Sequence, residues 1–283
     1  MRVSHIEDSP FDELPHLIAA GRGRTSSVRL LLFRGEVDTL PDELDAIVIA
    51  SDLQGVAPLS TRGGAVRLVG EVLAQKLRSL AERGALPPPS RTGVILAGDL
   101  YSAPDADVRG ATGDVREVWR AFAAAHRWVI GVAGNHDTFG TPAEVNQFMA
   151  EPGMALLDGT VVERGGLRVG GVGGIIGNAR RPGRREERAF LRSMAAVLSE
   201  APAVLVLHQG PDAERGALRG HPSVRQALDR SGPLLVVCGH VYWPQPLADL
   251  RGGAQALNAD GRVVVLTRGA PQEPASLRTD GSA

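Results

Sequence analysis

The amino-acid sequence predicts an α/β fold organised as one domain. Short apolar runs rich in β-branched residues alternate with longer segments in which apolar residues recur at helical spacing. Glycine is abundant, with 35 residues in a chain of 283, as is typical of a fold in which many strands end in tight loops. Five of the apolar runs are followed directly by polar side chains, and α/β folds place their chemistry in such loops.

The strand predictions rest on short apolar runs bounded by glycine or polar residues. The main runs are 28–33, 46–51, 93–97, 129–133, 204–207 and 234–238. Four shorter runs joined by glycine turns favour antiparallel pairing, and they are 154–157, 160–164, 167–172 and 174–176. Near the end of the chain, the runs 254–258 and 262–267 predict a closing β-hairpin around an Ala-Asp-Gly turn.

The helix predictions follow from apolar residues on one face and from capping residues. In the 141–150 segment, Thr141 is placed as N-cap and Pro142 as the first helical residue. The predicted helices are 12–20, 65–83, 114–126, 141–150, 188–198 and 223–230. These elements divide the chain into a partly helical N-terminal segment (1–27), the main domain (28–269) and a polar, flexible tail (270–283).

Composition disfavours several function classes. The formal net charge is -1 and aromatic residues are scarce, so neither a basic field nor stacking platforms favour nucleic acid as a partner. No apolar run reaches the length of a membrane span, and we predict no signal peptide. The single cysteine, Cys238, excludes an internal disulfide, agrees with a cytoplasmic location and is interpreted as a core residue.

Polar residues with metal-binding side chains follow the five strands. They are Asp52, Asp99, the pair Asn135 and His136, His208 and His240. Taken singly, each has an ordinary explanation as a turn residue, a helix N-cap or a hydrogen-bonded histidine. Five such positions in order instead favour a shared pocket, in which oxygen and nitrogen ligands suit borderline divalent metals. A carboxylate in such a pocket can bridge two ions that together clamp a phosphoryl group.

The order of these motifs resembles the calcineurin-like metallophosphoesterases, most specifically at Gly98-Asp99 and at Gly134-Asn135-His136-Asp137. The resemblance runs from about residue 46 to 267, and it implies a four-layer αββα sandwich with two facing mixed β-sheets flanked by helices. It further implies that Asp99 bridges two metals and that Asn135, His208 and His240 complete the second. His136 would steady the phosphate or protonate the leaving oxygen, Asp137 would orient His136, and Asn258 would be structural.

Two positions depart from the pattern of the family. Gln54 stands where the family's Asp-x-His has histidine, and Tyr242 stands where the final Gly-His-x-His has histidine. The first metal would then be held by Asp52, Asp99 and whatever Gln54 and Tyr242 offer. Oxygen ligands of this kind favour Mn or Mg over Zn, with Mn expected first and Fe, Zn, Mg or Co as alternatives. The other interpretations are a ferric ion with tyrosinate, or a first site that is weak or empty.

The sequence therefore predicts a cytoplasmic, metal-dependent enzyme that hydrolyses phosphomonoesters or phosphodiesters with metal-activated water. Gly98-Asp99 continues as Leu-Tyr-Ser, without the Asp-Arg-Gly typical of protein phosphatases, which favours a small phosphoester or nucleotide. The rival hypothesis is a metal-binding regulatory or scaffold protein on the same fold. A basic segment is interpreted as a solvated loop or as a holder of a second phosphate: Arg180, Arg181, Arg184, Arg185 and Arg188.

A few aromatic and histidine residues lie outside the five motifs. Trp243 is assigned either to the pocket wall or to the core, and Tyr101 to the edge of the pocket. The remaining histidines are predicted to be surface residues: His5, His16, His126 and His221.

Overall fold

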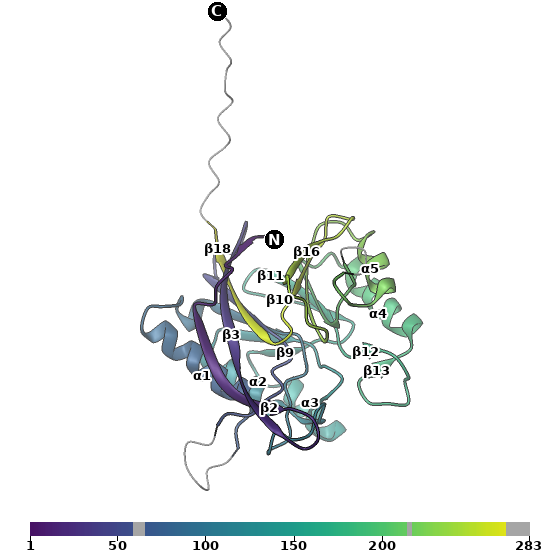
Figure 1. Ribbon diagram of the computed structural model, residues 1–283. Coiled ribbons are helices and arrows are strands. Elements are labelled where there is room, and N and C mark those ends of the chain that lie inside the picture. The colour runs from purple at the N-terminus through teal and green to yellow at the C-terminus, as the bar shows by residue number, and fades with distance from the viewer. Residues whose placement is uncertain (59–65, 214–216, 270–283) are drawn as a thin grey trace, which may run out of the picture.

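The computed structural model describes residues 1–58, 66–213 and 217–269, and it contains two facing β-sheets with helices on their outer sides (Figure 1). The first sheet has eight strands in the order β1-β3-β18-β4-β5-β7-β9, with β2 also paired to β3. Its strands are β1 (Val3–Ile6), β2 (Asp12–Ala19), β3 (Thr25–Val37), β4 (Ala46–Ala50), β5 (Thr92–Leu96), β7 (Trp128–Gly131), β9 (Met154–Leu156) and β18 (Arg262–Arg268).

The second sheet has six strands in the order β10-β11-β14-β15-β17-β16. They are β10 (Thr160–Arg164), β11 (Leu167–Val172), β14 (Val204–Gln209), β15 (Leu235–Gly239), β16 (Leu247–Asp249) and β17 (Gln255–Asn258). Two short pairs add to these sheets, β6 (Gly113–Asp114) with β8 (Asp137–Thr138) and β12 (Ile175–Ile176) with β13 (Arg184–Arg185). Both large sheets are mixed, because parallel central strands meet antiparallel neighbours.

The helices are α1 (Val69–Glu82), α2 (Arg116–Ala125), α3 (Pro142–Met149), α4 (Glu187–Ser199) and α5 (Pro222–Leu228), with a 3-10 turn at Pro89–Arg91. In Figure 1, α1, α2 and α3 lie beside the first sheet, and α4 and α5 lie beside the second. The predicted start of α3 is confirmed, because Thr141 caps the helix and Pro142 is its first residue. Among the described residues, no helix combines the length and apolarity that crossing a bilayer requires.

Three apolar clusters separate the four layers. Alternate residues of β4 point to opposite sides, so that Val48 packs with α1 and α2 while Ile47 and Ile49 pack between the sheets. A third cluster joins the outer face of the second sheet to Phe190 of α4 and Val224 of α5. This αββα arrangement confirms the predicted fold class. Cys238 and Trp243 are both buried, so Trp243 is a core residue rather than part of the pocket wall.

Two predicted elements are wrong, and the antiparallel pairing predicted for the short runs at 154–176 holds only for β10 with β11, because β9 pairs parallel with β7 and β12 parallel with β13. Residues 12–19 form strand β2 instead of a helix: the segment pairs antiparallel with β3, buried Leu14 and His16 flank exposed Pro15, and proline disfavours a helix interior. The predicted hairpin is also absent, because β17 belongs to the second sheet and β18 to the first. Both strands are almost wholly buried, which requires covering on both faces and a central place in a sheet.

The predicted tail at 270–283 lies outside the described residues, as does Ala65 at the predicted start of the first helix. The predicted surface positions of two histidines are wrong, since His16 and His126 are 7% and 9% exposed. Burial lowers the pKa of both imidazoles, which keeps them neutral near pH 7.

Candidate metal centre

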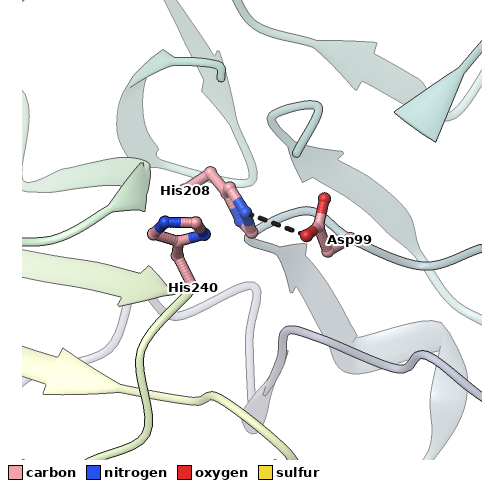
Figure 2. Close-up of side chains that lie close together, drawn as sticks. All are labelled: Asp99, His208 and His240. Atoms are coloured by element: carbon pink, nitrogen blue, oxygen red, sulfur yellow. Dashed lines mark ion pairs between the residues drawn. The ribbon is translucent and has the colours of Figure 1, made fainter. Parts of the chain in front are cut away.

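The loops that follow β5 and β15, together with the end of β14, bring three metal-binding side chains together. Asp99, His208 and His240 each offer a ligand atom, and these atoms lie within 4.8 Å of one another. Figure 2 shows the two imidazoles and the carboxylate side by side, although they come from both sheets. The convergence of strand ends that the sequence predicts is therefore present for these residues.

The ring of His208 is held with Nδ1 against the backbone and Nε2 towards Asp99. Its Nδ1 lies 2.7 Å from the carbonyl oxygen of Ala97, to which it donates a hydrogen bond, and its side chain is fully buried. Nε2 is therefore the nitrogen left for a metal ion. Burial lowers the pKa of His208, but the carboxylates of Asp99 and Asp52 outweigh it and raise the pKa to about 10, so without a metal Nε2 carries a proton that a bound metal ion would displace. Nε2 lies 3.3 Å from Asp99 Oδ2, but this contact lacks the geometry of a hydrogen bond.

Two buried atoms of the candidate ligands have no hydrogen-bond partner among the described residues. They are His208 Nε2 and the side-chain oxygen of Asn135, which is 6% exposed. A buried polar atom without a partner costs roughly 1–3 kcal/mol, so such atoms are rare in folded proteins. A divalent cation bound between them would satisfy both, so the donor set present here fits a metal ion.

The backbone is strained at three candidate ligands. Of the six non-glycine residues with positive φ in the described chain, three are Asp52, Asp99 and His240, with φ values of 53°, 54° and 70°. Each follows the end of a strand, β4, β5 or β15. Strain of this kind costs of order 1–3 kcal/mol and is concentrated at functional sites.

Asp99 lies at the centre of the site. Its Oδ1 accepts a hydrogen bond from the backbone N–H of His136 and its Oδ2 accepts one from the Gln54 amide, both at 2.9 Å. Burial raises its pKa, but the positive charge of His208 and the hydrogen bonds outweigh this and hold the pKa at about 2. Any side chain at Gly134 would collide with Asp99, which explains the glycine before Asn135.

Asp52 joins the two sheets at the site. Its Oδ2 accepts hydrogen bonds from Ser51 Oγ at 2.7 Å and from the backbone N–H of His240 at 2.8 Å. Burial, and then the carboxylates of Asp260 and Asp99, raise its pKa to about 8 against the lowering effect of His208. Burial together with the charge of His208 lowers the pKa of His240 to about 4, so its imidazole is neutral and can donate a lone pair.

The two departures from the family pattern have different positions. Gln54 belongs to the site, because it contacts Asp99 and lines a cavity of about 720 Å³ together with Asp52, His136 and His240. Tyr242 is 60% exposed, packs its ring 4.7 Å from the guanidinium carbon of Arg262 and lines a separate cavity. The structure therefore brings Gln54 to Asp99 and does not bring Tyr242 there.

The predicted partnership between Asp137 and His136 is wrong. Asp137 accepts hydrogen bonds from the backbone N–H groups of Asp99, Gly134 and Leu100, at 2.8, 2.8 and 2.7 Å. Both of its oxygens thus fasten the metal-binding loops to each other. Burial and the charge of Asp99 raise its pKa to about 6. The Nδ1 atom of His136 instead lies 3.3 Å from the hydroxyl of Thr112.

Two residues that sequence reasoning did not place at the site line the same cavity. Asp260 is half-buried, and its backbone forms a β-bridge with Ser51, next to Asp52. The Ala-Asp-Gly sequence around Asp260 was interpreted as a hairpin turn. No local feature of the sequence indicates that the chain instead crosses from the second sheet to the first at this point. His16 reaches the cavity from β2, and its ring lies so close to Gly55 that only glycine fits there.

The remaining sequence predictions near the site concern Asn258, Tyr101 and the basic segment. Asn258 is buried and donates to the carbonyl oxygen of Val241 at 2.9 Å, which supports the loop after His240. Tyr101 lines the cavity. The basic segment packs against the centre, since a side chain at Gly183 would collide with Asn135, while Arg185 pairs with Asp158.

Comparison with known proteins agrees with this geometry. Residues 46–244 match the calcineurin-like phosphoesterase family, and a search among curated proteins finds no match. The fold is similar to the crystal structure of TT1561 from Thermus thermophilus, with a TM-score of 0.55 and 19% identity over 77% of this chain and 90% of that chain. AQ665 from Aquifex aeolicus, described as a protein of unknown function, is similar at 14% identity over 78% of this chain and 95% of that chain, with a TM-score of 0.33.

These structural likenesses concern the fold alone, whereas the family match covers most of the chain. It includes every strand end that carries a predicted ligand, from Asp52 after β4 to His240 after β15. With the strand ends, the unpartnered donor atoms and the matched residues in agreement, this chain belongs to the calcineurin-like phosphoesterase family.

Proposed function

We propose that the protein is an active metal-dependent phosphoesterase that hydrolyses small phosphomonoesters or phosphodiesters. The observation that carries this proposal is the pair of buried, unpartnered ligand atoms, Asn135 Oδ1 and His208 Nε2, of which Nε2 lies 3.3 Å from the carboxylate of Asp99. Family membership supports phosphoester hydrolysis, and the adjoining cavity of about 720 Å³ is of the size that small ligands occupy.

The residues divide into two overlapping ligand sets. Asp99, Asn135, His208 and His240 would hold one divalent ion, the second metal of the family pattern. A second ligand set, Asp52, Asp99 and Gln54, would hold the first metal of that pattern. The second set offers oxygen ligands only, which favours Mn or Mg. A divalent metal supplies Lewis acidity at this place, which lowers the pKa of a water molecule and offsets the negative charge of the phosphate.

The chain itself would bind and orient the ester. His136 lines the cavity beside Asp99, and its backbone N–H is fixed by the Asp99 carboxylate. From there its imidazole would donate a hydrogen bond to the phosphate or a proton to the leaving oxygen. Thr112 would set the ring orientation through Nδ1, and Asp137 would keep the loops of Asp99 and Asn135 in register.

A metal-binding protein without catalytic activity is the second candidate, and one observation favours it. The Gln54 amide donates to Asp99 and Tyr242 lies elsewhere, so the second ligand set lacks both imidazoles that the family pattern would supply. One bound ion would then leave water activation weaker. We further propose a reducing cytoplasmic location and no membrane partner, and the charge and composition disfavour nucleic acid as a partner.

The test begins with protein stripped of metal by a chelator and reloaded separately with Mn, Mg, Fe, Co or Zn. Metal content is measured by elemental analysis, and turnover is measured with 4-nitrophenyl phosphate and bis(4-nitrophenyl) phosphate. We expect metal-dependent turnover that is lost in Asn135→Ala and His208→Ala. The matched control is His5→Ala, at an exposed histidine outside the cluster. Stoichiometric metal binding without turnover of either ester by any metal form would support the non-catalytic candidate.

A further inference from the structure

The cavity beside the metal centre is walled on one side by a hairpin that lies outside the family match. Strands β2 and β3 precede residue 46, where the match begins, yet they supply His16, Ile18, Val28 and Leu30 to the cavity lining. The same cavity reaches Asp99, His136 and His240. One continuous cavity therefore connects the metal-binding side chains with a part of the chain that lies outside the family match.

The hairpin turns one face towards this space, and that face is mainly apolar. His16 pairs directly with Val28 and Leu14 with Leu30 across the two strands. Because side chains alternate along a strand, His16, Ile18, Val28 and Leu30 share one side of the hairpin. The hairpin is also fixed to the metal-binding loop, since Leu17 and Val56 exchange backbone hydrogen bonds at 2.9 and 3.0 Å.

A second segment, residues 101–111, adds another wall, in which Tyr101, Val108 and Ala111 lie beside the polar residues Ser102 and Arg109. Val108 lines the cavity although 54% of its surface is exposed, and it is one of only four large hydrophobic residues that are exposed in the described chain. Thr25, at the start of β3, donates from its hydroxyl to the carbonyl oxygen of Asp105 at 3.0 Å. The two walls are thus tied together next to the metal centre.

Fixed positive charge on these walls is limited. Arg29 lines the cavity, but its guanidinium pairs with Glu13 at 2.6 Å. Arg109 is the other arginine in the lining, and it is exposed. A substrate with several phosphates would require more cationic partners in this space than one exposed arginine. An exposed valine in the same cavity as the apolar residues of the hairpin instead fits an uncharged group that covers it.

We propose that the cavity between the β2–β3 hairpin and the 101–111 segment binds the uncharged, apolar organic group of a phosphoester whose phosphate lies at Asp99, Asn135, His208 and His240. This inference rests on the proposed function for the position of the phosphate. The hairpin and Val108 then select the substrate, favouring aryl-like or similarly apolar esters over small polar ones. Val108 is a specificity residue, because it touches the organic group and none of the reacting atoms.

The test measures binding, so it does not depend on turnover. Phenylphosphonate and methylphosphonate carry the same charged head and differ in apolar area, and neither is hydrolysed as an ester. Calorimetric titration of the full-length protein in excess Mn should show that phenylphosphonate binds about 10-fold more tightly, as expected for burial of an aromatic ring. Val108→Ser should reduce this preference by about 3-fold or more, because it removes two methyl groups from the wall.

Val66→Ser is the matched control, since Val66 is also an exposed valine (40%) and does not line the cavity. It should leave the preference unchanged. Ile18→Ser, on the hairpin, should lower the preference as Val108→Ser does, and thermal melting checks that each variant is folded. Equal binding of both phosphonates, no binding of either, or equal effects of Val108→Ser and Val66→Ser would overturn the inference.

The two proposals fail in different ways. A preference for phenylphosphonate that Val108→Ser removes, in a protein that turns over no ester, supports the apolar subsite and contradicts the enzymatic function. Metal-dependent turnover with no discrimination between the phosphonates supports the enzymatic function and contradicts the subsite. Tighter binding of methylenediphosphonate than of phenylphosphonate, lost in Arg109→Ala, would assign the cavity to a second phosphate and also overturn the inference.

Discussion

The carboxylate of Asp52 accepts a hydrogen bond from the backbone N–H of His240, at 2.8 Å. These residues are far apart in the chain and follow strands of different sheets, β4 and β15. Both have positive φ, and any side chain at Gly239 would collide with Asp52. This hydrogen bond therefore fastens the two sheets at the edge where the metal-binding side chains meet.

The first prediction concerns the pH dependence of stability in the metal-free protein. Burial raises the pKa of Asp52 from 3.8 to about 8, so the folded state favours its protonated form. A carboxyl group with a raised folded pKa stabilises the fold below pH 4, and this stabilisation is lost as the pH rises towards 8. The free energy of unfolding of the unchanged protein, relative to that of Asp52→Asn, should fall between pH 4 and 8.

Urea unfolding in the presence of a chelator measures this difference. Asn keeps an oxygen acceptor for His240 and tolerates positive φ, so Asp52→Asn isolates the titration. Asp42→Asn, at an exposed carboxyl, is the control and should show no such slope. A difference between the unchanged protein and Asp52→Asn that is constant from pH 4 to 8 would refute the buried position of Asp52.

The second prediction distinguishes the structural role of Asp137 from an orienting role towards His136. Asp137→Asn replaces an oxygen acceptor by an NH₂ group, which leaves at least one of three buried backbone N–H groups unpaired. Loss of such an acceptor costs roughly 1–3 kcal/mol. We expect Asp137→Asn to destabilise the metal-free protein by about that amount, whereas His136→Ala leaves its stability within about 0.5 kcal/mol. Equal stability of the two variants by urea unfolding would contradict this role.

The strand ends were predictable from sequence because buried strands are locally recognisable and the side chains after them are distinctive. Asp99, His208 and His240 were assigned from such local signals, and the structure brings them together. The position of Tyr242 was not predictable in this way. The family pattern places an imidazole there, whereas the ring of Tyr242 packs against the guanidinium of Arg262.

Contacts between segments that are far apart in the sequence could not be predicted, because they depend on how those segments pack in the fold. The hydrogen bonds of Asp137 depend on how the loops after β5 and β7 pack, and nothing in Asn-His-Asp specifies this. Asp260 reaches the cavity only because β17 and β18 belong to different sheets, while an Ala-Asp-Gly sequence locally favours a hairpin. His16 reaches the site because Pro15 excludes a helix and β2 pairs with β3, which places His16 opposite Val28.

The third prediction restores one missing imidazole. Gln54 contacts Asp99 and lines the cavity beside Asp52, so Gln54→His should place a nitrogen ligand next to two carboxylates. We expect a higher metal content after dialysis against limiting metal, with the largest gain for Zn, because imidazole suits Zn better than an amide oxygen does. Tyr242→His is the matched variant and should change metal content little, since that position faces Arg262. Equal gains in metal content in Gln54→His and Tyr242→His would show that the gain does not depend on where the imidazole is introduced, and would contradict the prediction.

The fourth prediction assigns a role to Asp260, which lies in the metal cavity next to the strand that carries Asp52. Burial raises its pKa, and its charge raises that of Asp52, so two carboxylates repel each other unless a cation lies near them. Asp260→Asn removes one negative charge and keeps the shape of the side chain. We expect its affinity for Mn and Mg to fall about 10-fold and its affinity for Zn to fall less, because oxygen ligands contribute most to hard ions.

Titration calorimetry of the metal-free variants gives these affinities directly, without an assay of turnover. Asp42→Asn, remote from the cavity and fully exposed, controls for the change in net charge. Thermal melting without metal should show Asp260→Asn to be as stable as the unchanged protein or more stable, since relief of repulsion with Asp52 favours the fold. Weaker binding of Mn together with an unchanged or higher melting temperature places Asp260 beside the ion. Unchanged affinity for all three metals would exclude it from the site, leaving Asp52, Gln54 and Asp99 as the oxygen ligands of the first metal.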